Sequence, residues 1–150
     1  MAHILLERAT HHPVEQAWLR ITDWERHADT VPLTSTTVLT PPPTRVGTVF
    51  VARSGVGRAG FDDPMEVTVW EPPRDGRPGR CRLVKRGRAV TGWAELTAHP
   101  AAGGGSRVVW SEELRVRWLP AFFDGPLAWA ARRMFGRAAD DLLSGPSHPS

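Results

Sequence analysis

Residues 107–143 read RVVWSEELRVRWLPAFFDGPLAWAARRMFGRAADDLL and contain two kinds of hydrophobic periodicity in succession. From Arg107 to Arg117, apolar residues alternate with polar ones, which predicts a β-strand with one buried face. From Leu127 to Leu143, apolar and small residues recur at helical spacing, which predicts an amphipathic helix. The chain therefore places a long helix with an apolar face shortly after a half-buried strand.

Segments of strand composition also occupy much of the chain before residue 107, separated by turns rich in proline and glycine. Short connections between consecutive strands predict antiparallel pairing. Two short helices are predicted after the first strand, one opening at Pro13 with Thr10 or His12 as its cap, the other at Asp23. The predicted strands are His3–Ala9, Leu33–Thr40, Gly47–Ser54, Met65–Glu71, Arg80–Lys85, Ala89–Ala98 and Arg107–Arg117.

This order of elements predicts an α+β fold. A seven-stranded antiparallel sheet can bury its apolar face against one long helix if the sheet curls and the helix fills the concave side. Curling requires bulges or glycines within strands, and Gly92 lies inside an otherwise regular strand segment. We expect residues 1–143 to form a single domain and residues 144–150 to form a disordered tail.

Composition bounds the class of protein. The 150 residues are 41% apolar and 23% charged, as in a globular domain. No run reaches the roughly 20 apolar residues of a membrane helix, and a charge inside the first apolar stretch argues against a secretory signal. A single cysteine, Cys81, excludes an internal disulfide and a multi-thiolate metal site. We expect a cytoplasmic protein with no metal, no cofactor and no membrane insertion.

Basic residues concentrate in one part of the chain, although the net charge is only +3. Such a cluster could contact phosphates. Prolines and glycines mark a turn inside it, and neither a groove-reading helix nor stacking aromatic residues accompany it. A solvated hairpin is the favoured interpretation, so no nucleic-acid partner is predicted. The cluster comprises Arg74, Arg77, Arg80, Arg82, Lys85, Arg86 and Arg88.

Several stretches resemble the START-like superfamily, also called SRPBCC, and within it the polyketide cyclase/dehydrase and lipid-transport group. They read PVEQAW (13–18), DWERH (23–27) leading into VPL (31–33), VGTVF (46–50) and RVVWSEEL (107–114). The resemblance covers about Ile4 to Leu143 and rests on fold markers rather than catalytic signatures. It implies the helix-grip fold, also found in birch-pollen-allergen-like proteins, with a deep cavity that binds apolar or amphipathic small molecules. It does not imply one reaction, because members differ in activity.

Alternation along the strands assigns side chains to the two faces of the sheet independently of the family resemblance. Met65, Val67 and Val69 are expected to face inward. The strand around Phe50 is apolar on both faces and is not oriented by its pattern; if Val51 faces inward, Arg53 does too. Small inward residues on sheet and helix favour a cavity over simple close packing. The predicted ligand-binding residues are Val51, Arg53, Met65, Val67, Leu83, Gly92, Ala94, Trp110, Glu112, Leu114, Phe122, Phe123, Ala131, Met134 and Phe135.

Glu112 and His27 are the candidate catalytic residues. Glu112 shares the inner face of its strand with Trp110, where an ionised carboxylate is costly unless it is paired or its pKa is raised. It could orient a ligand or act as a general acid or base; the favoured alternatives are a buried structural pair, with Arg53 as a candidate partner, and a strand bulge that turns Glu112 outward. His27, beside Trp24, could transfer protons, with a surface or capping role as the alternative.

We also predict the positions of three side chains besides the two catalytic candidates. Phe122 and Phe123 are costly to expose, so we expect them to form part of the cavity mouth, with a core plug as a nearly equal alternative. Their segment runs from Trp118 to Pro126. Cys81 is expected to be an inert core thiol.

The sequence leaves three functions open. The leading hypothesis is binding of a lipid- or polyketide-like small molecule, and whether the protein is an enzyme stays open. The alternative is a polyketide aromatase/cyclase or dehydratase that uses the same cavity, although the chain has no tyrosine to serve as a phenolic acid. The third is a protein-interaction module that uses an exposed edge or an outer patch of Trp70 and Trp93. A homodimer stays open.

Overall fold

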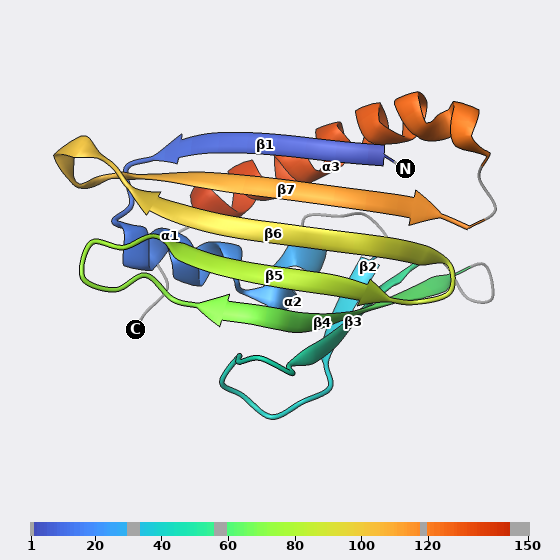
Figure 1. Cartoon of the computed structure of the whole chain (residues 1–150), viewed down its shortest axis with the longest axis horizontal. Helices are drawn as coiled ribbons and strands as arrows, with labels where there is room; N and C mark the ends of the chain where they lie inside the picture. The colour runs from blue at the N-terminus through green and yellow to red at the C-terminus, as the bar shows by residue number, and fades with distance from the viewer. Residues whose placement is uncertain (1, 30–33, 56–59, 118–119, 145–150) are drawn as a thin grey trace.

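The computed structural model of the chain describes residues 2–29, 34–55, 60–117 and 120–144 (Figure 1). Its seven strands and three α-helices agree with the predicted order, with boundaries shifted by a few residues. Short 3₁₀ turns occupy Ala102–Gly104 and Ala121–Phe123. The elements are β1 Ala2–Thr10, α1 Val14–Ile21, α2 Trp24–Asp29, β2 Thr34–Val38, β3 Val49–Ser54, β4 Phe61–Glu71, β5 Gly79–Arg86, β6 Val90–Pro100, β7 Ser106–Val116 and α3 Asp124–Ser144.

The strands form one curled antiparallel sheet in the order β1-β7-β6-β5-β4-β3-β2. The first and last strands are neighbours, with Ile4 opposite Glu112. Figure 1 shows the helices gathered on one side of this sheet, where α1 packs against β6 and β7, α2 against β2, and α3 along β1. The predicted arrangement of a curved sheet around a long C-terminal helix is therefore confirmed. Within the described ranges, no helix is both long enough and apolar enough to cross a membrane.

Alternation along β1, β6 and β7 builds the core. Inward residues such as Ile4, Leu96 and Trp110 are buried, while their sequence neighbours on the outer face are exposed or half-buried. Each fully buried large apolar side chain contributes about 1.5–3 kcal/mol of transfer free energy. The faces predicted for β6 and β7 are confirmed, and Glu112 lies on the inner face.

The apolar face predicted for α1 is buried, but the predicted cap is wrong. Pro13 occupies the N-cap position, and no side chain caps the helix. Thr10 instead accepts a hydrogen bond from the main-chain amide of His12, at 3.2 Å, in the turn before the helix. The buried residues of this face are Val14, Ala17, Trp18 and Ile21.

Two basic side chains bind the carbonyl groups at the C-terminal end of α3. Arg20 is completely buried, and its Nη1 donates a hydrogen bond to the Leu142 carbonyl at 3.1 Å. The Nε2 atom of His12 lies 2.7 Å from the Leu143 carbonyl. Donors here satisfy carbonyls that have no partner within the helix, and a positive charge is favourable at this end of the helix dipole. The last turn of α3 is thereby fixed to the helical layer.

A bulge in β4 reverses the predicted orientation of its second half. Val67 pairs with Leu83 and Trp70 pairs with Cys81, and the register shifts between Val67 and Val69. The extra residue moves Val69 to the outer face and Trp70 to the inner face. Trp70 packs on the ring of Trp18, with 5.0 Å between ring centroids. The prediction that Val69 faces inward and Trp70 outward is therefore wrong, as is the proposed outer Trp patch.

The orientation of β3 is set by Phe50. Its ring is buried and stacks on Trp24, with 4.7 Å between centroids. Alternation then places Val51 and Arg53 on the outer face, where Arg53 is exposed and forms an ion pair with Asp62 at 2.9 Å. The conditional prediction that Val51 and Arg53 face inward is wrong, because the larger aromatic side chain takes the inner position.

Gly92 permits a backbone conformation that other residues rarely adopt. Its φ angle is +133°, and an added Cβ atom would overlap the main-chain carbonyl oxygen of Glu113 on β7. We therefore expect Gly92→Ala to lower the free energy of unfolding by about 2–4 kcal/mol. Urea denaturation measures this change. Gly125→Ala is the matched control, because an added Cβ there meets nothing within 4 Å; equal stabilities of the two variants would refute the constraint.

Candidate functional site

A pocket of about 320 Å³ lies between the inner face of the sheet and helices α2 and α3. Most of its wall is aliphatic or aromatic, and almost every element of the fold contributes to it. The lining residues are Trp24, His27, Thr34, Thr36, Phe50, Ala52, Ser54, Asp63, Met65, Leu83, Lys85, Val90, Ala94, Leu96, Trp110, Glu112, Leu114, Val116, Leu127, Ala130, Ala131, Met134, Phe135 and Ala138.

The structure brings together most of the residues predicted to bind a ligand. Six of them do not line the pocket: Val51 and Arg53 lie on the outer face, Val67 is fully buried in the core, and Gly92, Phe122 and Phe123 are also absent from the wall. Whether the others bind a ligand stays a prediction. Those that line the pocket are Met65, Leu83, Ala94, Trp110, Glu112, Leu114, Ala131, Met134 and Phe135.

Phe122 and Phe123 contradict the core-plug alternative. Their side chains are 76% and 40% exposed, and the two rings contact one another at 4.2 Å between centroids. The core is therefore complete without the burial of either ring. A role at the mouth stays a prediction; Trp118 and Leu119 of the same segment lie outside the described residues.

Aromatic rings form one side of the pocket around Trp110. Phe135 of α3 stacks on Trp110 with 5.2 Å between centroids and a 20° interplanar angle. His27 of α2 lies 5.6 Å from the same indole and 5.5 Å from Trp24. Strand, short helix and long helix therefore each contribute one ring to a single apolar surface.

Three charged side chains, here called the buried trio, lie on the sheet wall of this pocket: Asp63, Lys85 and Glu112. The Lys85 Nζ atom lies 2.7 Å from Asp63 Oδ2, and the two side chains are only 6% and 14% exposed. Glu112 is 3% exposed. On β6, between the strands that carry Lys85 and Glu112, the inward residues are Gly92 and Ala94. Neither has a side chain long enough to separate the two charged groups.

The electrostatics of the buried trio follow from burial in an apolar wall. Burial raises the pKa of Glu112, which Lys85 opposes and the negative charge of Asp63 reinforces. Burial alone would lower the pKa of Lys85, but Glu112 and Asp63 together outweigh it, so the pKa of Lys85 is raised. Relative to solvent-exposed groups, the environment therefore stabilises the protonated form of Glu112 and the charged form of Lys85. The alternative that Arg53 pairs with Glu112 is wrong, because Arg53 lies on the outer face and pairs with Asp62, while Lys85 acts on Glu112 through its charge and forms its ion pair with Asp63.

The buried trio leaves hydrogen-bonding atoms unused. Glu112 Oε2 and Asp63 Oδ1 are buried and have no hydrogen-bond partner among the described residues. The side chain of Trp110, two residues before Glu112 on the same face of β7, interacts with the Glu112 carboxyl group through a hydrogen bond that partly opposes the rise in the pKa of Glu112. Buried polar atoms without partners are uncommon, and each costs about 1–3 kcal/mol. The two buried carboxyl oxygens are therefore costly features of the pocket wall.

His27 is a half-buried residue of α2 that also lines the pocket. Its Nε2 atom lies 2.7 Å from the Ile21 carbonyl, which requires Nε2 to carry the proton in that hydrogen bond. Burial lowers the pKa of His27, although the Ile21 carbonyl and Asp23 partly oppose this change. The neutral imidazole is therefore favoured. The bond to the carbonyl of Ile21, the last residue of α1, agrees with the capping alternative for His27, and a role in proton transfer stays a prediction.

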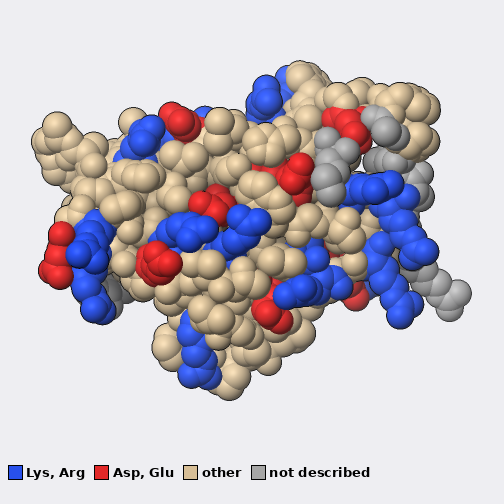
Figure 2. Space-filling model, in the orientation of Figure 1, with Lys and Arg blue, Asp and Glu red and all other residues tan. Residues whose placement is uncertain are grey.

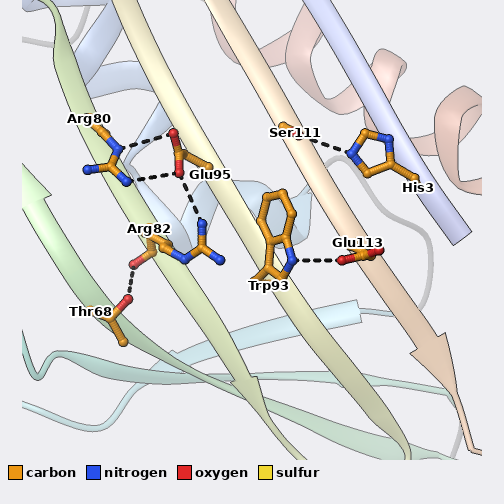
Figure 3. A network of polar contacts seen from close by, with 8 residues as sticks. All are labelled: His3, Thr68, Arg80, Arg82, Trp93, Glu95, Ser111 and Glu113. Atoms are coloured by element: carbon orange, nitrogen blue, oxygen red, sulfur yellow. Dashed lines mark hydrogen bonds and ion pairs between the residues drawn. The ribbon is translucent and has the colours of Figure 1, made fainter. Parts of the chain in front are cut away.

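Part of the predicted basic cluster lies on the outer face of the sheet. Figure 3 shows Arg80 and Arg82 converging on Glu95, with shortest contacts of 3.2 and 3.3 Å. Arg82 also covers the ring of Trp93 at 4.5 Å, and the Trp93 indole donates to Glu113 at 2.9 Å. Figure 2 shows basic and acidic side chains intermixed over this face. The absence of a nucleic-acid partner stays a prediction.

Lys85 and Asp63 are functional candidates that sequence reasoning missed. Lys85 was assigned to the solvated cluster, although its parity with Cys81 and Leu83 places it on the inner face. Asp63 has the parity of Met65, but the predicted strand began at Met65, and β4 begins at Phe61. The alternation that places Leu83 and Met65 on the inner face also places Lys85, two residues after Leu83, and Asp63, two residues before Met65, on that face.

Two features argue against other chemistries in the described residues. Cys81 is buried, and burial raises the pKa of its thiol to about 12, so it is an unreactive core side chain as predicted. Among the residues in the ranges above, no three His, Cys, Asp or Glu side chains are grouped so that they could hold a metal ion.

Comparison with solved structures finds the same architecture at low sequence identity. A START superfamily protein from Mycobacterium smegmatis superposes with a TM-score of 0.72 at 9% identity, over 95% of this chain and 97% of that chain. Ara h 8.0201 gives a TM-score of 0.61 at 12% identity, over 95% and 98%. The chain has the START-like helix-grip fold. No family model and no curated protein matches its sequence.

A third solved structure with this architecture is DynU16, described as a putative protein in the dynemicin biosynthetic locus. It matches with a TM-score of 0.59 at 19% identity, over 98% of this chain and 49% of that chain. The resemblance seen in the sequence is therefore confirmed at the level of the START-like fold, which these proteins share while differing in most residues.

The pH dependence of stability tests the burial of Glu112. Because its folded-state pKa is raised above the ordinary 4.5, the wild-type protein should lose unfolding free energy as the pH rises from 4.5 through that pKa. Glu112→Gln does not titrate, so its stability relative to the wild type should increase over the same range. Urea denaturation at a series of pH values measures the difference.

Glu113→Gln, on the outer face of the same strand, is the control for this experiment. It should keep the pH dependence of the wild type. Parallel pH profiles for the wild type and Glu112→Gln would show that the Glu112 carboxyl group is as well solvated in the folded protein as in the unfolded chain.

Proposed function

We propose that the chain binds an apolar or amphipathic small molecule, lipid- or polyketide-like, in the pocket between the sheet and α3. The observation that carries this proposal is the pocket itself, about 320 Å³ in volume and walled mainly by apolar side chains. Small-molecule sites are typically about 300–1,000 Å³, mostly apolar, with a few polar groups that orient the ligand. The buried trio is such a polar group.

Three of the α3 residues that line the pocket are alanines, which helps to explain why the pocket is not filled. Ala130, Ala131 and Ala138 line it, and a methyl group reaches only a short way towards the sheet. Opposite them, Ala94 occupies the inner face of β6. Interiors are otherwise close-packed, so a volume left open by small residues on both walls supports a binding role.

A bulky residue at position 94 should block the pocket. Ala94→Phe adds a ring between Leu83 and Glu112, its cross-strand neighbours, and should weaken binding of a hydrophobic fluorescent probe at least about tenfold. Thr91→Phe, exposed on the same strand, is the matched control and should bind as the wild type does. Fluorescence titration measures both affinities, and circular dichroism confirms folding. Unchanged binding by folded Ala94→Phe would place the probe elsewhere.

A polyketide aromatase/cyclase or dehydratase is the second candidate function. Glu112 and His27 line one pocket, and burial shifts their pKa values in opposite directions, raising that of the carboxyl group and lowering that of the imidazole. Two titratable groups with separated pKa values are suited to general acid and base roles. The START-like neighbour from the dynemicin locus also supports testing this activity.

The enzyme proposal is tested with a poly-β-keto thioester substrate and product analysis by mass spectrometry. The wild type should accelerate cyclisation or dehydration, while Glu112→Gln and His27→Gln should each lower the rate about 100-fold or more. Both variants should still bind the substrate. A wild-type rate no faster than the uncatalysed reaction would leave the binding function alone.

A further inference from the structure

Three aromatic side chains are exposed at the N-terminal end of α3 and in the turn before it. They are Phe122, Phe123 and Trp129, of which Trp129 is 64% exposed. A single exposed ring is common on a protein surface, but three within residues 122–129 form a local concentration of apolar area. Exposed apolar area of this kind marks an interaction surface.

Three arginines continue this surface along the helix. Arg132, Arg133 and Arg137 follow Trp129 by three, four and eight residues, so the four side chains share one face of α3. The guanidinium group of Arg133 lies over the Trp129 ring, 5.1 Å from its centroid. The arginines and the three exposed rings are here called the α3 surface.

The positive charge of the α3 surface is not neutralised within the described part of the chain. All three arginines are exposed, and none of them forms an ion pair with a described residue. Residues 125–139 contain no aspartate or glutamate. Asp140, the next acidic residue, pairs with Arg8 of β1 at 2.7 Å. The α3 surface therefore fits a partner that carries negative charge.

The mouth of the pocket opens beside the α3 surface. Ala130 and Met134 line the pocket and are also exposed, so they lie where the pocket meets solvent. Each directly follows a residue of the α3 surface, Trp129 or Arg133, and successive residues are separated by about 100° around a helix. The rings, the arginines and the mouth therefore occupy neighbouring faces of the same turns.

We propose that the α3 surface docks the protein on membranes that contain anionic lipids. A bilayer surface presents anionic headgroups directly above apolar chains, so one partner accommodates both the arginines and the exposed rings. Tryptophan and other aromatic side chains favour this boundary. Docking is peripheral, with the helix lying on the membrane. Docking itself is independent of the proposed ligand-binding function, but it would bring the mouth of that pocket to the bilayer.

Vesicle co-sedimentation tests the proposal with the whole protein. The wild type is mixed with vesicles of phosphatidylcholine alone or of phosphatidylcholine with about 30% phosphatidylserine, a composition that supplies the negative surface charge. We expect at least about tenfold tighter binding to the anionic vesicles. Raising NaCl from about 0.1 M to about 0.5 M should weaken this binding severalfold, because salt screens exposed charges.

Charge variants assign binding to the α3 surface. Replacing Arg132, Arg133 and Arg137 together by Gln should weaken binding to anionic vesicles at least about tenfold. The matched control replaces three exposed arginines of the β2–β3 and β4–β5 connections by Gln and so removes the same charge. Figure 1 shows these connections away from the N-terminal end of α3, and the control should bind as the wild type does. Its arginines are Arg45, Arg74 and Arg77.

Ring variants test the apolar part of the surface. Phe122→Ser combined with Trp129→Ser should weaken binding about fivefold or more, because binding strength scales with the apolar area that enters the headgroup region. Leu39→Ser combined with Val46→Ser is the control, since both residues are 61% exposed and lie outside α3. Circular dichroism confirms that each variant is folded.

The outcomes keep docking separate from ligand binding. None of the α3 arginines lines the pocket, so the folded arginine variant should keep the wild-type affinity for the hydrophobic fluorescent probe while losing vesicle binding. Equal weakening by both arginine triples would attribute binding to net charge and overturn the proposal. Wild-type protein that binds neither kind of vesicle, or both equally, would also overturn it, and the first result would favour an acidic protein as the partner.

Discussion

The way in which α3 meets the sheet determines the rest of this structure. At its C-terminal end the helix is held closely, with Leu142 and Leu143 buried and their carbonyl groups bound by Arg20 and His12. Towards its N-terminal end the helix presents alanines to the sheet, and Met134 lines the pocket while remaining exposed. One end of the helix therefore closes the core and the other leaves it open. The pocket is the result of this difference in side-chain size.

Burying the charged side chains of the buried trio in this apolar interior costs free energy, so their presence needs an explanation. Taking an ion pair out of water costs several kcal/mol per ion, and its attraction offsets this only when every polar atom is satisfied. Lys85 and Asp63 form an ion pair, but one oxygen of Glu112 and the second oxygen of Asp63 have no hydrogen-bond partner among the described residues. A core selected for stability alone would have apolar residues here. The arrangement supports the proposed binding function, because a few polar groups in a mostly apolar pocket commonly orient a ligand.

The sequence predicted the fold well because its strongest signals are periodic. Alternation in β6 and β7 and the helical pattern of α3 correctly placed Glu112, Ala94 and Trp110. Prediction failed where a local event changes parity or where the pattern has no preferred face. The bulge after Val67 reversed the rest of β4, and only the stacking of Phe50 on Trp24 decides the orientation of β3.

The errors in the candidate site have a second physical origin. Lys85 and Arg53 were judged by their charge, which suggested the surface for one and a pairing role for the other, whereas strand position determines where each points. Phe122 and Phe123 were expected to need burial, yet single exposed aromatic residues are tolerated on protein surfaces. The buried Arg20 was not predicted, because its role depends on the last turn of α3, about 120 residues away in the chain.

A crystal structure of the protein soaked with 2-naphthol tests the central claim most directly. The account predicts the naphthalene ring between Ala94 and Trp110 on one side and α3 on the other. The position of the ring is the decisive observation. Naphthol found only on the outer surface would contradict the account.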